Sequence, residues 1–362
     1  MTNQNTNHKK KVGWFCTYTP EELIHAAGFT PFRLLPQHRA GDSSVEDALP
    51  GNICPYPRKI LSNLRSGLYE DMAGIVVANS CNAMIHLYNV LKEESGIFVY
   101  LLDVPRRQDE LAVEYYTREL ELLSEFLGDK GEPVDEGALQ RTIEIYRKKG
   151  ELLERFAGLN GNVTDGLYPD GLYGLAMEAA ALDPETFISK MEEAAENTGA
   201  GEKEPGSSKS QKCSLLLAGG LPPQGLMEML SELPELQVYP ENCAGLRYLQ
   251  KPKPAAPSGT NSSSTGILRL IASSYLEKPP CPRVFNRQMR EDYYRGLLED
   301  LKVRAVIYHD LMFCDMSHYD YLMLKDLMQE KEIPHLKVKT ELGEEDLGQL
   351  KTRVEAFLEI LE

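Results

Sequence analysis

The sequence predicts an α/β protein with two parallel sheets separated by a long helical stretch. Short apolar runs alternate with helical patterns in the first and in the last part of the chain, and almost no strand signal interrupts residues 107–197. Such alternation is typical of parallel strands whose connecting helices cover both faces of the sheet. We therefore expect two α/β units of similar layout, with a cleft between them.

The first unit is expected to begin with a strand at residues 11–16 and a helix directly after it. Thr19 is the expected N-cap of that helix, since it precedes a proline at the first helical position, and Gly28 is placed to end the helix. Two further apolar runs, at residues 74–79 and 97–102, predict the next strands, with a helix between them.

The middle of the chain shows helical periodicity instead of strands. The stretch that follows, rich in Gly, Ser, Lys and Glu, predicts a flexible linker at residues 198–212. The predicted helices are 110–126, 136–157 and 184–196.

The alternating pattern then restarts, which predicts a second α/β unit after the linker. Its expected strands are 214–217, 236–239, 304–308 and 335–339, and its expected helices are 224–233, 286–302, 319–331 and 344–361. A Pro- and Ser-rich stretch at 251–266 reads as a loop insertion. The whole pattern predicts two flavodoxin-like or Rossmann-like domains, 1–106 and 213–362, with a helical layer at 107–197.

Composition excludes several classes of function. The formal net charge of −16 argues against a nucleic-acid partner, whose phosphates attract basic surfaces. No apolar run approaches the roughly 20 residues of a membrane span, and the first 30 residues carry no secretory signal pattern. Seven cysteines, an odd number, fit reduced thiols better than disulfides. We expect a cytoplasmic protein.

The cysteines are the most informative residues of the chain. In an open parallel sheet, ligands collect outside the carboxyl ends of the strands. Thiols far apart in sequence could therefore converge there, and converging soft thiolates suggest zinc or an iron–sulfur centre. Cys16, Cys81, Cys243 and Cys314 come at or just after predicted strands, Cys54 and Cys281 lie in Pro-flanked loops, and Cys213 begins a strand at the opposite end.

Spacing alone leaves the identity of that centre open. No two cysteines share the CxxC spacing of local zinc pairs, and ferredoxin spacings are also missing. The competing interpretation is structural, because free cysteine often behaves as a small buried hydrophobe. Arg58, close to Cys54 in sequence, is a candidate for orienting an anionic substrate.

Several short blocks resemble the 2-hydroxyacyl-CoA dehydratase/benzoyl-CoA reductase (D-component) family. They occur in the family's order and extend nearly end to end. The blocks are Cys16-Thr17-Tyr18-Thr19-Pro20-Glu21-Glu22-Leu23, Ile53-Cys54-Pro55-Tyr56, Asn79-Ser80-Cys81-Asn82-Ala83-Met84, Glu241-Asn242-Cys243-Ala244-Gly245, Phe313-Cys314-Asp315 and Gly348-Gln349-Leu350-Lys351-Thr352-Arg353.

The resemblance implies ligands for an iron–sulfur centre at the domain cleft. The Cys-Pro-Tyr, Ser-Cys and Phe-Cys-Asp blocks of the family hold a cluster, which makes Cys54, Cys81 and Cys314 the first set of ligands here. The Glu-Asn-Cys block is similar to that of the double-cubane cluster proteins, homodimers whose [8Fe-9S] centre has six cysteine ligands. Cys243, with Cys281 and Cys16, would complete a second set of three.

The resemblance also implies a function and two alternatives. The branch with six cysteines implies a low-potential iron–sulfur reductase of small-molecule substrates, supplied with electrons by a separate ATP-hydrolysing activase. The first alternative is a 2-hydroxyacyl-CoA dehydratase subunit with one [4Fe-4S] cluster and a ketyl-radical mechanism. The second is a non-enzymatic carrier or scaffold for iron–sulfur units.

Overall fold

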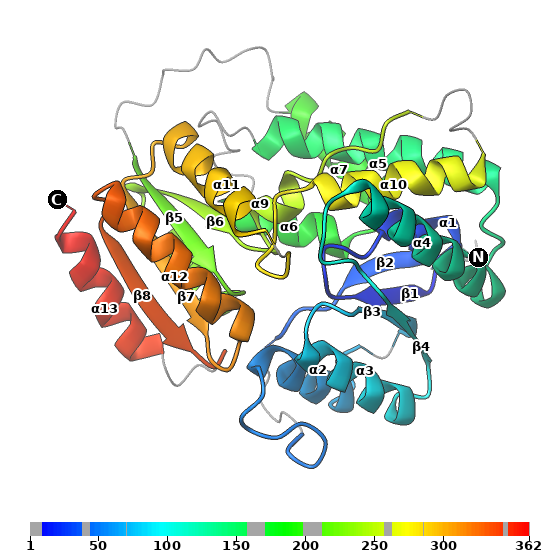
Figure 1. Cartoon of the computed structure of the whole chain (residues 1–362), viewed down its shortest axis with the longest axis horizontal. Coiled ribbons are helices and arrows are strands. Elements are labelled where there is room, and N and C mark those ends of the chain that lie inside the picture. The colour runs from blue at the N-terminus through cyan, green and yellow to red at the C-terminus, as the bar shows by residue number, and fades with distance from the viewer. Residues whose placement is uncertain are drawn as a thin grey trace, which may run out of the picture.

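The computed structural model describes residues 9–37, 44–69, 71–157, 171–197, 212–256, 263–284, 286–342 and 347–361. Within these ranges the chain forms two separate four-stranded sheets, and every strand pair in both is parallel (Figure 1). The α/β fold predicted from the sequence is confirmed. The strands are β1 (Lys11–Trp14), β2 (Thr30–Arg33), β3 (Met72–Ala78), β4 (Phe98–Leu102), β5 (Cys213–Gly219), β6 (Leu236–Glu241), β7 (Ala305–Leu311) and β8 (His335–Thr340).

The two sheets have the same topology. Their strand orders are β2-β1-β3-β4 and β6-β5-β7-β8. In each sheet, therefore, the second strand in the sequence lies at the edge, followed by the first, the third and the fourth. The order reverses direction between β1 and β3 in one sheet and between β5 and β7 in the other. Such switch points open a crevice at the carboxyl ends of the strands, where ligands bind. The expected duplication is therefore present, and each sheet has one such switch point.

Helices cover both sheets, and the chain between the sheets is helical, as predicted (Figure 1). The bounds of the domains themselves remain a prediction, and the expected linker at 198–212 lies almost wholly outside the described residues. The helices are α1 (Glu21–Ala26), α2 (Pro55–Arg65), α3 (Asn82–Glu94), α4 (Glu110–Lys130), α5 (Glu136–Ala157), α6 (Gly171–Ala181), α7 (Pro184–Asn197), α8 (Gln224–Ser231), α9 (Leu246–Leu249), α10 (Ser264–Glu277), α11 (Arg287–Asp300), α12 (Asp315–Glu330) and α13 (Leu347–Glu359).

Five elements, β2, α2, α6, α9 and α10, were not predicted individually from the sequence, and three of them have a clear local reason. β2 contains Pro31, which is tolerated because β2 is an edge strand. α2 begins Pro55-Tyr56-Pro57, and its prolines suit the first turn, where N–H groups have no partner inside the helix. α10 starts inside the stretch predicted as a loop insertion, with the Ser263 hydroxyl accepting from the backbone of Gly266.

Two expected helix signals near the N-terminus had different outcomes. Gly28 follows α1 with φ of +81°, a left-handed conformation that glycine adopts without strain, as predicted. Thr19 was predicted as the N-cap, but Pro20 occupies that position and no side chain caps the helix. The Thr19 hydroxyl has no hydrogen-bond partner within the described part of the chain. The tight turn that closes Thr19 N–H onto the Cys16 carbonyl carries the chain into α1 instead.

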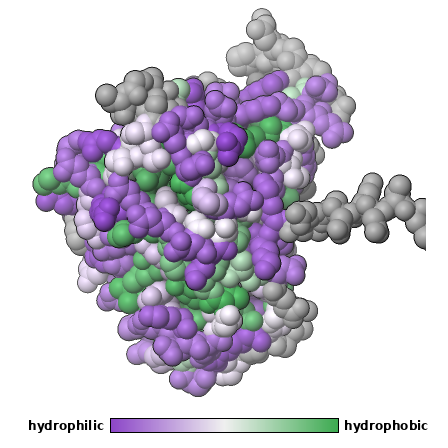
Figure 2. Space-filling view, turned by 90° about the vertical axis from the view of Figure 1, so that its right-hand side faces the viewer, coloured by the Kyte–Doolittle hydropathy of each residue, from purple (hydrophilic) through white to green (hydrophobic). Residues whose placement is uncertain are grey.

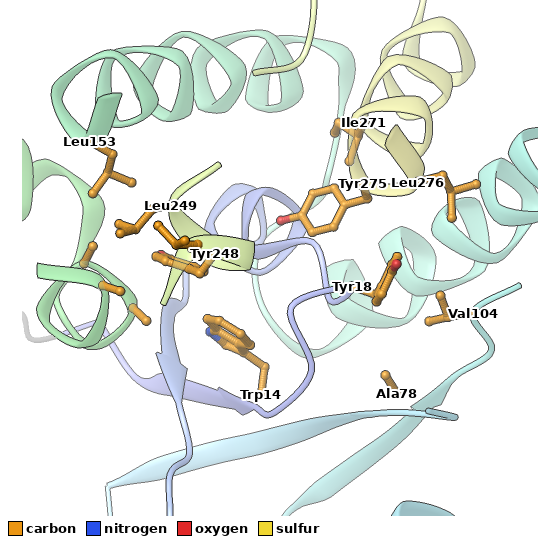
Figure 3. Close-up of a cluster of buried hydrophobic side chains, with 14 of the residues drawn as sticks. Trp14, Tyr18, Ala78, Val104, Leu153, Tyr248, Leu249, Ile271, Tyr275 and Leu276 are labelled. Atoms are coloured by element: carbon orange, nitrogen blue, oxygen red, sulfur yellow. The ribbon is translucent and has the colours of Figure 1, made fainter. Parts of the chain in front are cut away.

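One continuous hydrophobic core joins the two units. It includes Trp14 and Val76 of the first sheet, Leu216 and Tyr308 of the second, and apolar residues of the helices between them. Trp14 lies stacked on Tyr248, with 6.2 Å between the ring centroids (Figure 3). Because residues of both units share this core, the position of one sheet relative to the other is fixed by packing.

The surface is mainly hydrophilic on the side that carries α4, where apolar residues gather in a band amid polar ones (Figure 2). β4 is the edge strand there, and Leu111 and Leu122 of α4 are exposed. No helix in the described part of the chain combines the length and hydropathy that a bilayer-spanning segment needs.

Candidate metal centre

A cavity of about 190 Å³ lies where the carboxyl ends of the two sheets meet, and six of the seven cysteines line it. It takes wall residues from the segments that follow β1, β3, β5, β6 and β7. Two larger surface hollows, of about 510 and 1210 Å³, are lined by no cysteine. The cavity brings together Cys16, Cys54, Cys81, Cys243, Cys281 and Cys314, all the cysteines predicted as ligands.

The thiols of Cys54, Cys81 and Cys314, here called the helix set, each occupy the N-cap position of a helix. The helices are α2, α3 and α12. A helix N-terminus carries partial positive charge, which favours a thiolate. First-turn N–H groups act to lower the pKa of each of these thiols, although none forms a close capping hydrogen bond.

Within the helix set, Cys54 and Cys314 are direct neighbours. A hydrogen bond from the Cys54 thiol to the Cys314 sulfur raises the pKa of Cys54 and lowers that of Cys314. Burial raises the pKa of the third member, Cys81. A metal centre would displace the protons of these thiols, since thiols ligate as thiolates.

Cys16, Cys243 and Cys281, here called the loop set, cap no helix. Cys16 follows β1, Cys243 follows β6, and Cys281 lies between α10 and α11. Burial raises the pKa of Cys16, and the nearby charges of Lys278 and Arg283 oppose that rise. The loop set is therefore surrounded by charged side chains, whereas the helix set lies at the dipoles of helix N-termini.

Four cationic side chains are buried around the loop set: Arg33, Arg247, Lys278 and Arg283. The Arg33 guanidinium donates to the Cys243 carbonyl at 2.6 Å and lies over the Trp14 ring at 5.1 Å. Arg247 forms a bidentate ion pair with Glu241, with N–O distances of 2.5 and 2.8 Å. Arg247, Lys278 and Arg283 line the cavity, whereas Arg33 does not.

Lys278 is the most enclosed of these cations, with 1% of its surface exposed. Its ammonium donates to the Thr17 hydroxyl and lies 3.6 Å from the centre of the Tyr18 ring. Burial lowers the pKa of Lys278 to about 7, against the raising influence of Cys16 and Cys281. Arg283 is held by the backbone, donating to the carbonyls of Val104 and Pro105.

A family model matches nearly the whole chain. The model for 2-hydroxyglutaryl-CoA dehydratase, D-component, covers residues 16–361. The chain belongs to this family.

Curated relatives of this D-component chain are subunits of enzymes. The (R)-phenyllactyl-CoA dehydratase beta subunit of Clostridium sporogenes is 23% identical, over 100% of this chain and 94% of the relative. One of the benzoyl-CoA reductase subunits of Thauera aromatica is 24% identical, over 91% and 85%. The (R)-2-hydroxyglutaryl-CoA dehydratase subunit beta of Acidaminococcus fermentans is 21% identical, over 98% and 93%. The family resemblance inferred from the cysteine blocks is confirmed.

The cavity of this D-component chain suits an iron–sulfur centre better than a single zinc ion. Four sulfurs around zinc, at 2.3 Å each, would lie about 3.8 Å apart. No three cysteine sulfurs in the described ranges lie within 4.8 Å of one another. The wall includes six thiols but no histidine, aspartate or glutamate. Many soft donors spread around a mostly apolar cavity are what a larger iron–sulfur unit requires.

The remaining residues singled out from the sequence lie elsewhere. Cys213 begins β5 and packs, partly buried, against the core of the second sheet. Arg58 does not line the cavity, and its guanidinium lies 3.7 Å from Glu46. The buried cations were missed. Of them, only Arg283 carried a sequence signal, because it closes the Pro-Pro-Cys-Pro-Arg stretch around Cys281.

Proposed function

We propose that this D-component chain is a low-potential iron–sulfur reductase, with a double-cubane [8Fe-9S] centre held by the helix set and the loop set together. One observation supports the proposal above the others: all six thiols line a single cavity. A single [4Fe-4S] cluster would use only half of them. Buried free cysteines with a purely structural role have no reason to gather at the carboxyl ends of two sheets.

The chain itself would supply ligands, a dry environment and fixed charge. The centre, when bound, supplies electrons of low potential to a small substrate. Phe15, Met84, Leu221 and Leu311 form apolar parts of the cavity wall. Burial and neighbouring charge are among the levers by which a protein sets the potential of such a centre.

We further propose two protein partners. Electrons would come from a separate ATP-hydrolysing activase, and the sequence has no GxxxxGK[ST] phosphate-binding loop of its own. The chain would pair with a second copy of itself as a homodimer. Support for assembly in general comes from the relatives, which are named as subunits of larger enzymes.

Metal content tests this proposal directly. We expect anaerobically reconstituted chain to hold about eight irons, with acid-labile sulfide in similar amount. Replacing Cys243 or Cys281 by alanine should remove about half of the iron. Cys213→Ala is the matched control and should leave it unchanged, because Cys213 lies outside the cavity. Fewer than four irons per chain in well-folded protein would contradict the proposal.

The second candidate is a 2-hydroxyacyl-CoA dehydratase subunit with one [4Fe-4S] cluster on the helix set. The relatives favour it, since three of the curated ones are named as dehydratase subunits for phenyllactyl-, lactoyl- and 2-hydroxyglutaryl-CoA. This function predicts about four irons per chain, lost on replacing Cys81 and retained on replacing Cys243. Turnover of a 2-hydroxyacyl-CoA with activase and ATP would support it. Activase-dependent reduction of azide or hydrazine would instead support the double-cubane reductase.

A further inference from the structure

The buried charges of the described residues balance everywhere except beside the loop set. Five carboxylates are buried, and each lies within ion-pair distance of a lysine or arginine: Glu21, Glu22, Glu241, Asp310 and Asp320. Six lysines and arginines are buried. Three of these, Lys149, Arg247 and Arg290, pair with carboxylates. The other three, Arg33, Lys278 and Arg283, have no carboxylate within 4 Å in the described part of the chain.

Three buried cations without counter-charge are costly. A charge removed from water needs an opposite charge or a full set of hydrogen bonds to stay ionised. Arg33 retains two buried guanidinium nitrogens, Nε and Nη2, and Arg283 retains one, Nε, without a hydrogen-bond partner among the described residues. Lys278 has one hydroxyl and one aromatic ring as neighbours. Arg33 and Arg283 therefore carry buried positive charge that no carboxylate of the described residues balances. Lys278, whose pKa burial lowers to about 7, becomes fully charged at neutral pH only when an opposite charge lies beside it.

All three cations act on the loop set. The Arg33 guanidinium donates to the backbone carbonyl of Cys243, and Lys278 and Arg283 line the same cavity as Cys16 and Cys281. The main influences on the helix set are of another kind. Besides burial, they are backbone N–H groups, the other thiols and the Asp315 carboxylate. The loop set thus has cationic side chains beside it, whereas the helix set has only the partial positive charges of backbone N–H groups.

We propose that Lys278, Arg283 and Arg33 balance the negative charge of the part of the iron–sulfur centre held by the loop set, and that this part accepts the first electron. The inference rests on the function proposed above. It concerns the charge of this chain's own residues and is independent of the substrate. Arg33 does not line the cavity, and its guanidinium donates to the backbone carbonyl of Cys243, which ties it to a residue of the loop set.

The redox step is simple in its balance. A one-electron reductant such as titanium(III) is oxidised to titanium(IV), the centre gains one electron, and no bond forms or breaks. The added negative charge is stabilised most where full positive charges are closest and water is excluded. The three cations should therefore raise the potential of the loop-set part above that of the helix-set part. They are positioning residues for charge and need not touch a substrate.

The test is a titration of reconstituted wild-type chain and variants with titanium(III) citrate, followed by EPR. Lys278→Met removes one charge at similar side-chain length. At a fixed solution potential we expect its reduced-to-oxidised ratio to fall at least tenfold, equivalent to 59 mV for one electron. Lys278→Arg should restore most of the ratio. Lys331→Met is the matched control, because Lys331 pairs with Glu299 at the surface and its loss should leave the ratio unchanged.

Unfolding provides a second readout that does not depend on reduction. Metal-free Lys278→Met should unfold at the same or a higher temperature than the wild type, since it no longer buries a lone cation. The loaded variant should unfold at a lower temperature than the loaded wild type. Equal destabilisation with and without metal would assign Lys278 a merely structural role. Lys278→Gln, which keeps a polar contact to Thr17, repeats the measurement if the methionine variant does not fold.

The outcomes separate this inference from the function on which it rests. A wild-type chain that binds fewer than four irons overturns both. Full iron content with an unchanged titration in Lys278→Met overturns the inference and leaves the proposed function standing. An unchanged titration with weakened binding of azide, used as a small anionic probe, would also overturn it, because Lys278 would then serve a substrate.

Discussion

The contact between Trp14 and Tyr248 should make the two α/β units unfold together. Tyr248 follows β6, yet its ring is stacked on Trp14 of β1, and 6% of the residue is exposed. Its hydroxyl contacts the Lys149 ammonium at 3.1 Å and the Glu21 carboxylate at 3.3 Å. One side chain thus joins the first sheet, the second unit and the helical layer.

Two substitutions distinguish the contribution of the Tyr248 hydroxyl to stability from that of its ring. Tyr248→Phe removes only the hydrogen bonds to charged groups, at a cost of about 2 kcal/mol in the free energy of unfolding. Tyr248→Ala also removes the ring and leaves a cavity. Truncating a buried aromatic residue costs about 3–5 kcal/mol, and a stacked pair adds about 1 kcal/mol. We therefore expect a total near 5 kcal/mol for the alanine variant.

Trp14, as the single tryptophan of the chain, reports on this contact directly. Denaturant unfolding should be followed by its fluorescence and by far-UV circular dichroism, and the two transitions should coincide. Tyr319→Ala is the control, because Tyr319 is 72% exposed and should change stability by less than about 0.5 kcal/mol. A loss below about 1 kcal/mol for Tyr248→Ala, or two separate transitions in the wild type, would refute the reasoning.

Three further predictions concern the second unit, one of them at the wall of the cavity. Gly219 has φ of +105°, and a Cβ there would lie 2.3 Å from the His309 carbonyl oxygen. Gly219→Ala should therefore lower the free energy of unfolding of the metal-free chain by more than about 2 kcal/mol, as measured by chemical denaturation. Gly296→Ala, in open space on α11, should instead stabilise it by about 0.5–1 kcal/mol. Burial lowers the pKa of His309 to about 4, below its usual 6.5, so the unfolded chain binds the extra proton between these values. His309 should therefore leave the free energy of unfolding unchanged above pH 6.5 and lower it by up to about 3 kcal/mol as the pH drops toward 4. Thermal unfolding measured at a series of pH values should show a weaker pH dependence for His309→Gln than for the wild type. Cys213→Ser, outside the cavity, should keep wild-type iron-dependent absorbance after reconstitution, and losing that absorbance would count against the assignment of the six ligands.

The fold could be predicted from the sequence wherever a segment's pattern reflects its surroundings. β3, β5 and β7 are central strands covered on both faces, and their continuous apolar runs identify them. β2 escaped prediction because four residues with a proline look like a turn, and only an edge position makes that proline acceptable. α10 escaped because its first turn is Ser-, Thr- and Gly-rich. In both cases a tertiary position outweighed local propensity.

The candidate site could likewise be predicted only in part from the sequence. Its cysteines could be found, because strand ends mark where a parallel sheet gathers ligands. Its cations could not be, because Lys278 in Leu-Glu-Lys-Pro-Pro reads as a solvated residue at a helix end. Lys278 is buried only because Thr17 and Tyr18, more than 250 residues earlier, cover it. A contact of that separation leaves no trace in the spacing of residues.

The distribution of the six cysteines between the two units bears on how the protein is made. Cys54 and Cys81 come from the first unit and Cys314 from the second, whereas the loop set takes Cys16 from the first and Cys243 and Cys281 from the second. Neither set is complete on one unit alone. A ribosome must therefore have translated codon 281 before the loop set is complete, and codon 314 before the helix set is complete. Cofactor insertion on this scaffold would have to follow translation of much of the second unit, and a chain that ends before residue 281 could hold neither half of the centre.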